Sequence, residues 1–152
     1  MRLLYLCNND GSDVRINKEV KSLSRICKID FVGMKQVENH CFVEPWVEQT
    51  YFVKSKRKSV KGLLQYLFLV AKLMITNRYQ HIHIVNEPLL LVCFPVVMCS
   101  RAKIVLDIFD SMFLRMNSSG EKYLWLKSLL YSYVDHILVT DETRKSLLPE
   151  KF

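Results

Sequence analysis

The sequence contains little glycine and proline, with only four of each in 152 residues. This composition excludes a collagen-like chain and a low-complexity chain. None of the five cysteines forms a Cys-x-x-Cys pair, and most of them lie in apolar runs. We therefore expect reduced, buried thiols in a cytoplasmic protein, because structural disulfides belong to oxidising compartments.

Long uninterrupted apolar runs are also missing from the sequence. A membrane-spanning helix needs about 20 apolar residues. The run at 63–75 is broken by Gln65 and Lys72, and the run at 89–99 is short and contains Pro95. The N-terminal apolar run is too short for a secretory signal, and charged and turn-forming residues follow it at once. The sequence thus predicts neither a membrane span nor a signal peptide.

Acidic residues are the minority among the charges. The chain has 15 Asp and Glu against 22 Lys and Arg, a net charge of +7 and a pI near 9.2. A basic protein attracts phosphates, acidic lipids or nucleic acid. The densest basic run contains no acid and comprises Lys54, Lys56, Arg57, Lys58 and Lys61. No aromatic residue interleaves with it, so we expect no nucleic-acid partner.

Short apolar runs alternate with longer helical patterns along the chain. Expected strands lie at 3–7, 28–33, 50–53, 81–85, 103–108 and 136–140, and expected helices at 14–23, 60–77, 88–100 and 121–133. Nearly continuous apolar strands linked by helices form a parallel sheet with helices on both faces. With right-handed crossovers, this order predicts an α/β fold: one doubly wound, mostly parallel, Rossmann-like domain over residues 1–152.

The first strand, loop and helix suggest a ligand site. A polar loop at 8–12 follows the strand, Gly11 supplies a permissive backbone, and Asp13 stands where a helix N-cap belongs. Ligands of open α/β sheets bind beyond the carboxyl ends of the strands, near helix N-termini. No Gly-x-Gly-x-x-Gly is present, so a dinucleotide fingerprint is absent. A plain strand-to-helix turn is the alternative interpretation.

Four segments, in order, are similar to motifs of one enzyme family. Residues 13–20 (DVRINKEV) are similar to an Asp-x-Arg-Val-x-x-Glu helix start, and 79–86 (YQHIHIVN) to a Tyr-Asp-x-x-His strand. Residues 103–110 (KIVLDIFD) are similar to a strand ending in His-Asp, and 134–140 (VDHILVT) to an Ala-Asp-x-Ile-x-x-x-Ser segment. The chain thus resembles the N-terminal lobe of two-lobed (GT-B class) glycosyltransferases, the bacterial family 4-like N-terminal domain.

The resemblance implies the acceptor-binding lobe of a nucleotide-sugar-dependent glycosyltransferase in polysaccharide or glycolipid assembly. The donor-binding second Rossmann lobe is absent from this chain, so we expect it in a longer chain or in a partner subunit. The lobe alone should have little activity. No cofactor is implied beyond the nucleotide-sugar co-substrate, and the acceptor is a sugar or a lipid-linked sugar. Phe109 replaces the family histidine that lies near the reacting sugar. The alternative is a non-catalytic Rossmann-like module or a membrane-anchoring subunit paired with a separate catalytic lobe.

Polar residues at the predicted carboxyl ends of strands form the candidate site. Glu87 and Asp110 are the carboxylates there that could act as a general base, although capping and turn formation are alternatives. Asp107 lies inside its strand, where a structural role is expected. The predicted substrate-binding residues are Asn9, Asp10, Gly11, Arg15, Lys18, His83, Asn86 and Ser111.

Two of these residues have open alternatives. Arg15 could pair with Glu19 four residues on, or could hold a phosphate-bearing acceptor by two hydrogen bonds. His81 and His83 share one face of a strand, but no carboxylate or cysteine completes a ligand set nearby in sequence. We therefore predict no metal site, with His81 as a packing residue and His83 as support for the cleft.

The basic run continues into an apolar helix that begins at Val60. One interpretation is a solvated loop. The other is a membrane patch formed by Lys54, Lys56, Arg57, Lys58 and Lys61, in which each charge adds about 1 kcal/mol on anionic lipid. A lipid-linked acceptor would require such a location, so we expect a cytoplasmic protein at the inner face of the cell membrane.

Overall fold

The computed structural model of the protein describes residues 1–35, 42–55, 59–109, 124–140 and 148. Five of the predicted functional residues lie outside this part of the chain. They are Lys56, Arg57 and Lys58 of the basic run, and Asp110 and Ser111 after the fifth strand.

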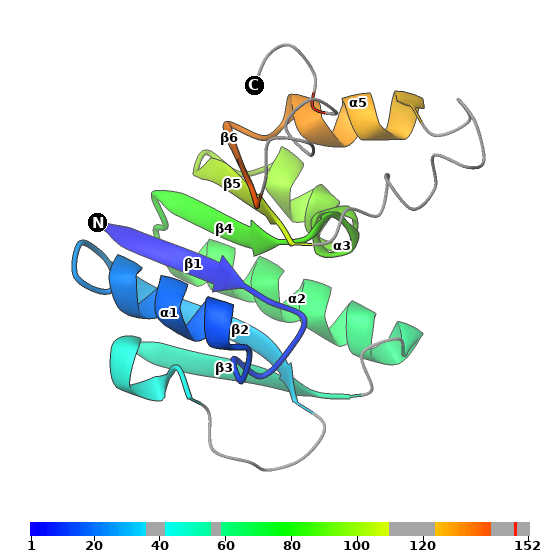
Figure 1. The fold of residues 1–152 in the computed structure, drawn as a ribbon. Helices are drawn as coiled ribbons and strands as arrows, with labels where there is room; N and C mark the ends of the chain where they lie inside the picture. The colour runs from blue at the N-terminus through cyan, green and yellow to red at the C-terminus, as the bar shows by residue number, and fades with distance from the viewer. Residues whose placement is uncertain (36–41, 56–58, 110–123, 141–147, 149–152) are drawn as a thin grey trace.

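A six-stranded, all-parallel sheet forms the centre of the protein (Figure 1). In spatial order the strands are β3 (Gln49–Lys54), β2 (Lys28–Lys35), β1 (Arg2–Leu6), β4 (His81–Val85), β5 (Lys103–Ile108) and β6 (His136–Val139). The predicted strands are confirmed, with ends that shift by one or two residues. Continuous apolar runs mark these strands because a parallel sheet is covered on both faces.

Helices cover both faces of the sheet, which confirms the doubly wound, Rossmann-like α/β fold. The helix α1 (Val14–Leu23) and the short 3₁₀ helix η1 (Glu44–Trp46) pack on one face. The other face carries α2 (Val60–Thr76), α3 (Glu87–Met98) and α5 (Leu124–Ser132), as Figure 1 shows. Within the described ranges, no helix is both long and apolar enough to cross a membrane.

The chain reverses its winding direction between β1 and β4. From β1 the strand order proceeds outward to β2 and β3, and α2 then brings the chain back to β4 on the other side of β1. In open α/β sheets, ligands bind at such a switch point, outside the carboxyl ends of the strands. The fold therefore directs attention to the carboxyl ends of β1, β4 and β5.

The two sides of the sheet have different cores. Aliphatic side chains of the strands pack against α2, α3 and α5 on one side. On the α1 side the buried cluster is smaller and includes the rings of Tyr5 and Phe31. Tyr66, fully buried on the first side, donates its hydroxyl to the carbonyl oxygens of Cys7 and Val32. This bond ties α2 to the carboxyl ends of β1 and β2.

Candidate functional site at the carboxyl ends of β1, β4 and β5

Three rings form a row across the α1 face of the sheet. Tyr5 of β1 lies in register with Phe31 of β2 and with His83 of β4. The Tyr5 ring is stacked on Phe31 at 5.7 Å between centroids and on His83 at 4.6 Å, with its plane nearly parallel to that of the imidazole. The row fixes the plane of the His83 ring beneath α1.

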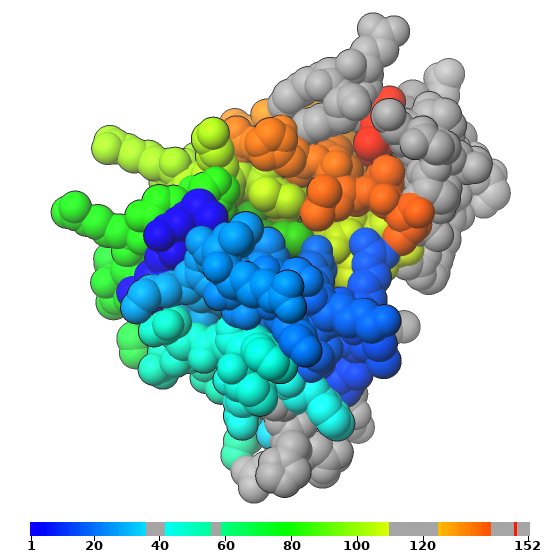
Figure 2. Space-filling model, turned by 60° about the vertical axis from the view of Figure 1, so that its left-hand side comes forward, coloured from blue at the N-terminus to red at the C-terminus, as the bar shows by residue number. Residues whose placement is uncertain are grey.

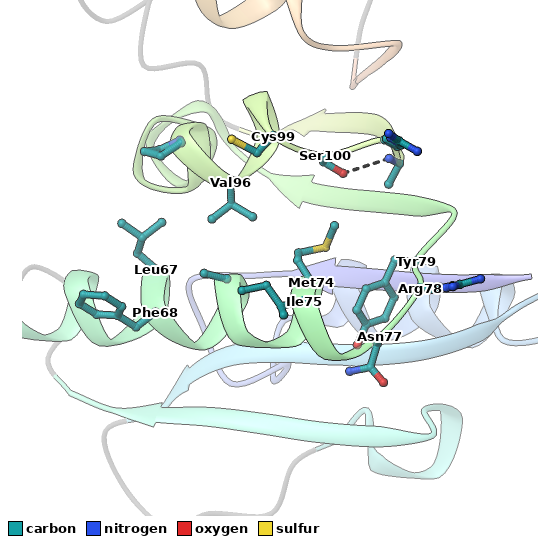
Figure 3. Close-up of a pocket in the computed structure, with 14 residues that line it drawn as sticks. Leu67, Phe68, Met74, Ile75, Asn77, Arg78, Tyr79, Val96, Cys99 and Ser100 are labelled. Atoms are coloured by element: carbon teal, nitrogen blue, oxygen red, sulfur yellow. Dashed lines mark hydrogen bonds between the residues drawn. The ribbon is translucent and has the colours of Figure 1, made fainter.

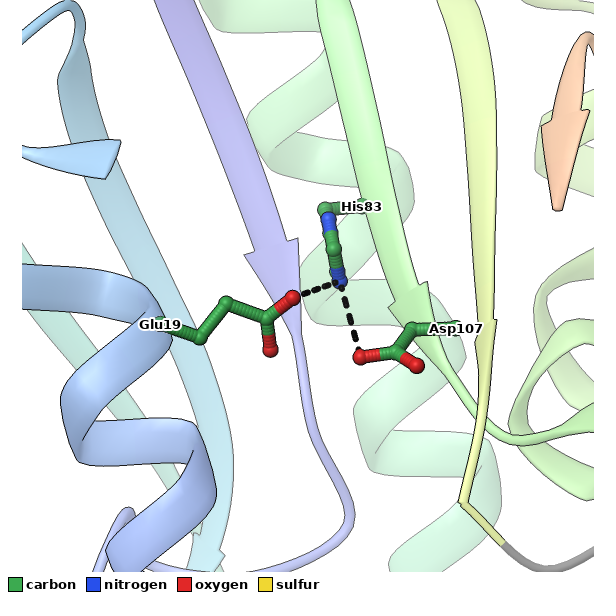
Figure 4. Close-up of side chains that lie close together, drawn as sticks. All are labelled: Glu19, His83 and Asp107. Atoms are coloured by element: carbon green, nitrogen blue, oxygen red, sulfur yellow. Dashed lines mark ion pairs between the residues drawn. The ribbon is translucent and has the colours of Figure 1, made fainter. Parts of the chain in front are cut away.

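Two carboxylates converge on the imidazole of His83 (Figure 4). Its Nε2 lies 3.4 Å from Oε1 of Glu19 on α1 and 3.7 Å from Oδ2 of Asp107 on β5. His83 and Asp107 are buried, while Glu19 is slightly exposed. Three elements far apart in sequence thus bring one nitrogen and two oxygen donors together at the switch point.

The second oxygen of each carboxylate is held by a protein donor. Tyr5 donates its hydroxyl to Oε2 of Glu19 at 2.7 Å, and Arg15 donates Nη2 to Oδ1 of Asp107 at 2.7 Å. The oxygen that faces His83 is therefore the one each carboxylate has available. Within the described residues, His83 Nε2 and Asp107 Oδ2 are buried and have no hydrogen-bond partner.

Burial governs the ionisation of this cluster. It raises the pKa of Glu19 above its ordinary value, and His83 opposes the shift. Burial, followed by the neighbouring Glu19 charge, also raises the pKa of the Tyr5 hydroxyl. Tyr5 thus remains a neutral donor. An unpartnered buried polar atom costs about 1–3 kcal/mol, so an arrangement with two such atoms is expensive unless something binds them.

Arg15 reaches from α1 across to β5. Besides its bond to Asp107, its guanidinium carbon lies 3.7 Å from the centre of the Phe109 ring. Figure 2 shows the blue α1 segment beside the yellow end of β5 on the surface. The prediction left two roles open for Arg15. The ion pair is made with Asp107 rather than Glu19, and 38% of the side chain stays exposed to a ligand.

In the loop after β1, side chains of the loop accept hydrogen bonds from its own backbone amides. Asp13 caps α1, as predicted, and accepts a hydrogen bond from the Arg15 amide at 2.8 Å. The amides of Gly11 and Ser12 donate to the side chains of Asn9 and Asp10. These amides are therefore occupied. Asn9, Asp10 and Gly11 shape the loop, and the interpretation as a plain strand-to-helix turn describes these contacts better than a phosphate-binding loop.

Close contact with β2 fixes the same loop in place. The carbonyl oxygen of Asn9 accepts a hydrogen bond from the Met34 amide, and a Cβ on Gly33 would clash with it. Gly11 has a φ of +80° and lies against Val43, so a side chain there would be strained as well as crowded. These two glycines allow the β1 loop to lie flat against its neighbours.

The two predicted site residues that follow β4, Asn86 and Glu87, form hydrogen bonds within the fold. Asn86 has a left-handed backbone, with φ of +68°, and its Oδ1 accepts a hydrogen bond from the Phe109 amide. It thereby joins the ends of β4 and β5. Glu87 is fully buried and accepts a hydrogen bond from Tyr131 of α5. So placed, Glu87 is not accessible to a substrate, and we correct its assignment as a general base to a packing role.

The remaining predicted residues lie on the surface. Lys18 is exposed on α1, one turn after Arg15. Lys54 at the end of β3 and Lys61 in the first turn of α2 are exposed as well. Lys61 belongs to α2, which packs on the face of the sheet opposite His83, whereas Lys54 ends the edge strand β3.

Sequence reasoning missed Glu19 and Asp107 as members of the site. Glu19 is three residues after Ile16, on the helix face that Ile16 and Val20 bury. Asp107 stands between buried Leu106 and Ile108 in a strand. A carboxylate at a core-facing position of an element is the signal that could have indicated both, because buried charges need a partner.

A groove lies between the C-terminal halves of α2 and α3, on the other face (Figure 3). It has a volume of about 900 Å³ and is mainly apolar, with Phe68, Ile75 and Val96 among its lining residues and Arg78 and Arg101 at its end. It opens near the amino ends of β4 and β5, away from His83.

Comparison with known proteins shows little similarity. No protein-family model and no curated protein matches the chain. Among solved structures, a protein of unknown function from Vibrio parahaemolyticus is similar over 93% of each chain, with a TM-score of 0.47 and 7% identity. A similarity this weak carries no argument about function.

Proposed function

We propose that this chain is the acceptor-binding N-terminal lobe of a nucleotide-sugar-dependent glycosyltransferase acting at a membrane surface. One observation carries the proposal: segments similar to three separate family motifs converge at the carboxyl ends of β1, β4 and β5. Arg15 of the first contacts Asp107 of the third, and Asp107 faces His83 of the second. These strand ends lie at the switch point, where open α/β sheets bind ligands.

In this proposal the acceptor lies over the carboxyl ends of β1, β4 and β5. A second Rossmann lobe, in a longer chain or a partner subunit, holds the nucleotide-sugar donor. An acceptor hydroxyl attacks the anomeric carbon, a glycosidic bond forms, and the nucleoside diphosphate leaves with the electrons of the broken bond. Arg15 binds an anionic group of the acceptor through the exposed part of its guanidinium. The hydroxyl proton passes to Asp110, the predicted general base.

Sugar transfer by the full-length gene product tests this proposal. We would incubate the protein with membrane lipids and a panel of radiolabelled UDP- and GDP-sugars, and measure label in the lipid and polysaccharide fractions. We expect donor-dependent transfer by the full-length product, with the partner subunit added where the second lobe is a separate chain, and little or none by residues 1–152 alone. Absence of transfer with every donor, or full activity of residues 1–152 alone, would contradict the proposal.

Two substitutions assign the roles within that assay. Arg15→Ala and Asp110→Ala should each lower turnover at least tenfold, which corresponds to about 1.4 kcal/mol of barrier. Arg25→Ala is the matched control, because Arg25 is exposed just after α1. Thermal melting of each variant separates lost activity from lost folding. Wild-type turnover in a folded Arg15→Ala protein would remove Arg15 from the acceptor site.

The exposed side of α2 supports a membrane location and is also what a membrane-anchoring module would require. Its exposed apolar side chains recur on one stripe of the helix: Val60, Leu64, Phe68 and Ile75. Lys61 and Lys72, also exposed, lie along one side of this stripe. Apolar side chains bordered by basic ones are typical of helices that lie in the surface of an anionic bilayer.

Vesicle co-sedimentation tests this surface. We expect the protein to bind vesicles of phosphatidylcholine with phosphatidylglycerol more tightly than vesicles of phosphatidylcholine alone. Replacing Lys61 and Lys72 by Ala should weaken binding about fivefold per residue, and Phe68→Glu should abolish it. Lys28→Ala, at the amino end of β2, is the control. Equal binding to both vesicles would argue against the membrane location, and binding without any sugar transfer would favour the anchoring module.

A further inference from the structure

The facing donor atoms of Glu19, His83 and Asp107 have the spacing of metal ligands. His83 Nε2, Glu19 Oε1 and Asp107 Oδ2 all lie within 4.8 Å of one another, and the nitrogen is 3.4 and 3.7 Å from the two oxygens. Zinc bonds to nitrogen and carboxylate oxygen are about 2.0–2.2 Å long, which separates ligands at tetrahedral angles by about 3.3–3.5 Å. Small side-chain adjustments would bring all three atoms onto one ion.

A protonated histidine between two carboxylates is the competing explanation. Charge-assisted N–H···O bonds are about 2.7–2.9 Å long, and both separations here are longer. One proton on Nε2 can serve only one carboxylate well, whereas a cation bonds all three atoms at once. In the part of the chain that the structure describes, Nε2 of His83 and Oδ2 of Asp107 are buried, face each other and lack hydrogen bonds. A cation would satisfy both.

The surroundings of the cluster match those of a metal site. Ligating carboxylates and histidines are normally held by further hydrogen bonds and packing. Here Tyr5 binds the second oxygen of Glu19, Arg15 binds the second oxygen of Asp107, and the Tyr5 ring fixes the imidazole plane. Glu19 is partly exposed, so an ion can approach the cluster from that side.

We propose that Glu19, His83 and Asp107 bind one divalent first-row transition-metal cation, of which Zn²⁺ is the test case. One imidazole nitrogen with two carboxylate oxygens suits Zn²⁺ or Mn²⁺ better than Mg²⁺ and Ca²⁺, which prefer all-oxygen sites with more ligands. The ion joins α1 to β4 and β5 at the switch point. Its role is to fix the position of these elements, and it stabilises the fold because it binds only the folded chain.

The charge of Arg15 distinguishes the metal proposal from the transferase proposal. A cation at this site adds two positive charges close to the guanidinium that binds Asp107. Replacing Arg15 by Gln removes this charge and keeps an amide donor for Asp107, so it should tighten metal binding, although the same change should weaken acceptor binding in the proposed transferase. The two proposals thus make opposite predictions for one residue, and either can fail without the other.

Calorimetric titration of residues 1–152 with Zn²⁺ tests the site, and Co²⁺ absorption spectra report its ligands. All proteins carry Cys99→Ser, because Cys99 is an exposed thiol that could bind zinc. We expect one ion per chain with micromolar or tighter affinity, a raised melting temperature, and no thiolate charge-transfer band. Arg15→Gln should bind at least threefold more tightly than the parent protein.

Conservative substitutions identify the ligands. His83→Gln, Asp107→Asn and Glu19→Gln should each weaken binding at least a hundredfold, whereas His81→Gln on the same strand and Asp30→Asn at the other end of the sheet should leave it unchanged. Circular dichroism verifies folding, and Glu19→Gln at the partly exposed position is the variant least able to disturb it. No binding by the folded parent, or unchanged binding by folded Glu19→Gln, would overturn the proposal.

Discussion

The two ends of the sheet contain similar ionic clusters with different surroundings. At the amino end, Asp30 of β2 is fully buried and pairs with Arg2 at 2.7 Å, and Tyr79 donates to the same carboxylate at 2.6 Å. At the carboxyl end, Asp107 is fully buried and pairs with Arg15 at 2.7 Å. The arginines are similarly exposed, at 36% and 38% of their side chains.

The clusters differ in the number of buried polar atoms that lack a hydrogen bond. Arg2 and Tyr79 both bind one oxygen of Asp30, and among the described residues no second carboxylate pairs with them. The Asp107 cluster adds Glu19 and His83, and within it Nε2 of His83 and Oδ2 of Asp107 have no hydrogen bond. The amino-end cluster leaves one buried atom without a hydrogen bond, Oδ1 of Asp30, whereas the carboxyl-end cluster leaves two, Nε2 of His83 and Oδ2 of Asp107, and these two face each other as the ligands of a bound ion would.

The largest expected contrast concerns the two aspartates. Asp30→Ala should lower the free energy of unfolding by about 3–5 kcal/mol, because it leaves the Tyr79 hydroxyl buried without its acceptor and Arg2 without its partner. Asp107→Ala should cost only about 1–2 kcal/mol in metal-free protein, since it relieves repulsion with Glu19 and, unlike Asp30→Ala, leaves no buried tyrosine hydroxyl without its acceptor. Urea unfolding in the presence of a chelator measures both. Equal losses would mean that the carboxyl-end cluster is purely structural.

Removing the hydroxyl of Tyr79 at the amino end should cost more stability than removing that of Tyr5 at the carboxyl end. Tyr79→Phe should cost about 2 kcal/mol, because its partner oxygen on Asp30 is fully buried. Tyr5→Phe should cost about 1 kcal/mol, because water can reach Glu19. Tyr133→Phe, at an exposed position, is the control and should have no effect. Thermal unfolding of the three variants gives the order, and a larger loss for Tyr5→Phe would reverse our view of the two ends.

The smallest contrast is between the arginines. Arg2 contacts Asp30 through both Nε and Nη2, whereas Arg15 contacts Asp107 through Nη2. A lysine ammonium can replace a single contact, but it cannot reproduce the two contacts that a guanidinium makes at once. Arg2→Lys should therefore cost about 1 kcal/mol and Arg15→Lys about 0.5 kcal/mol, both reduced by solvent screening. Urea midpoints determined in parallel test this order, and the reverse order would contradict it.

Much of the fold could be predicted because local patterns specify it. Apolar runs such as 81–85 lie where β4 forms, and Asp13 caps α1 as its position before Val14 indicated. The order of strands and helices was enough to predict a parallel sheet with two covered faces. The role of Glu87 could not be predicted, because a glutamate before a proline at a helix start normally faces solvent, and only the approach of Tyr131 from α5 makes its burial tolerable.

The strands and helices, their order and the basic charge could all be predicted from the sequence, because each depends on neighbouring residues or on composition. It also led us to predict no metal site, because no carboxylate or cysteine lies near His83 in the sequence. The carboxylates that face His83 come from distant segments, and only the tertiary structure brings them there. Parallel packing brings positions 19, 83 and 107 together on the α1 face, and Tyr5 and Arg15 orient them. Contacts between distant segments depend on strand order and helix placement, which no local pattern encodes.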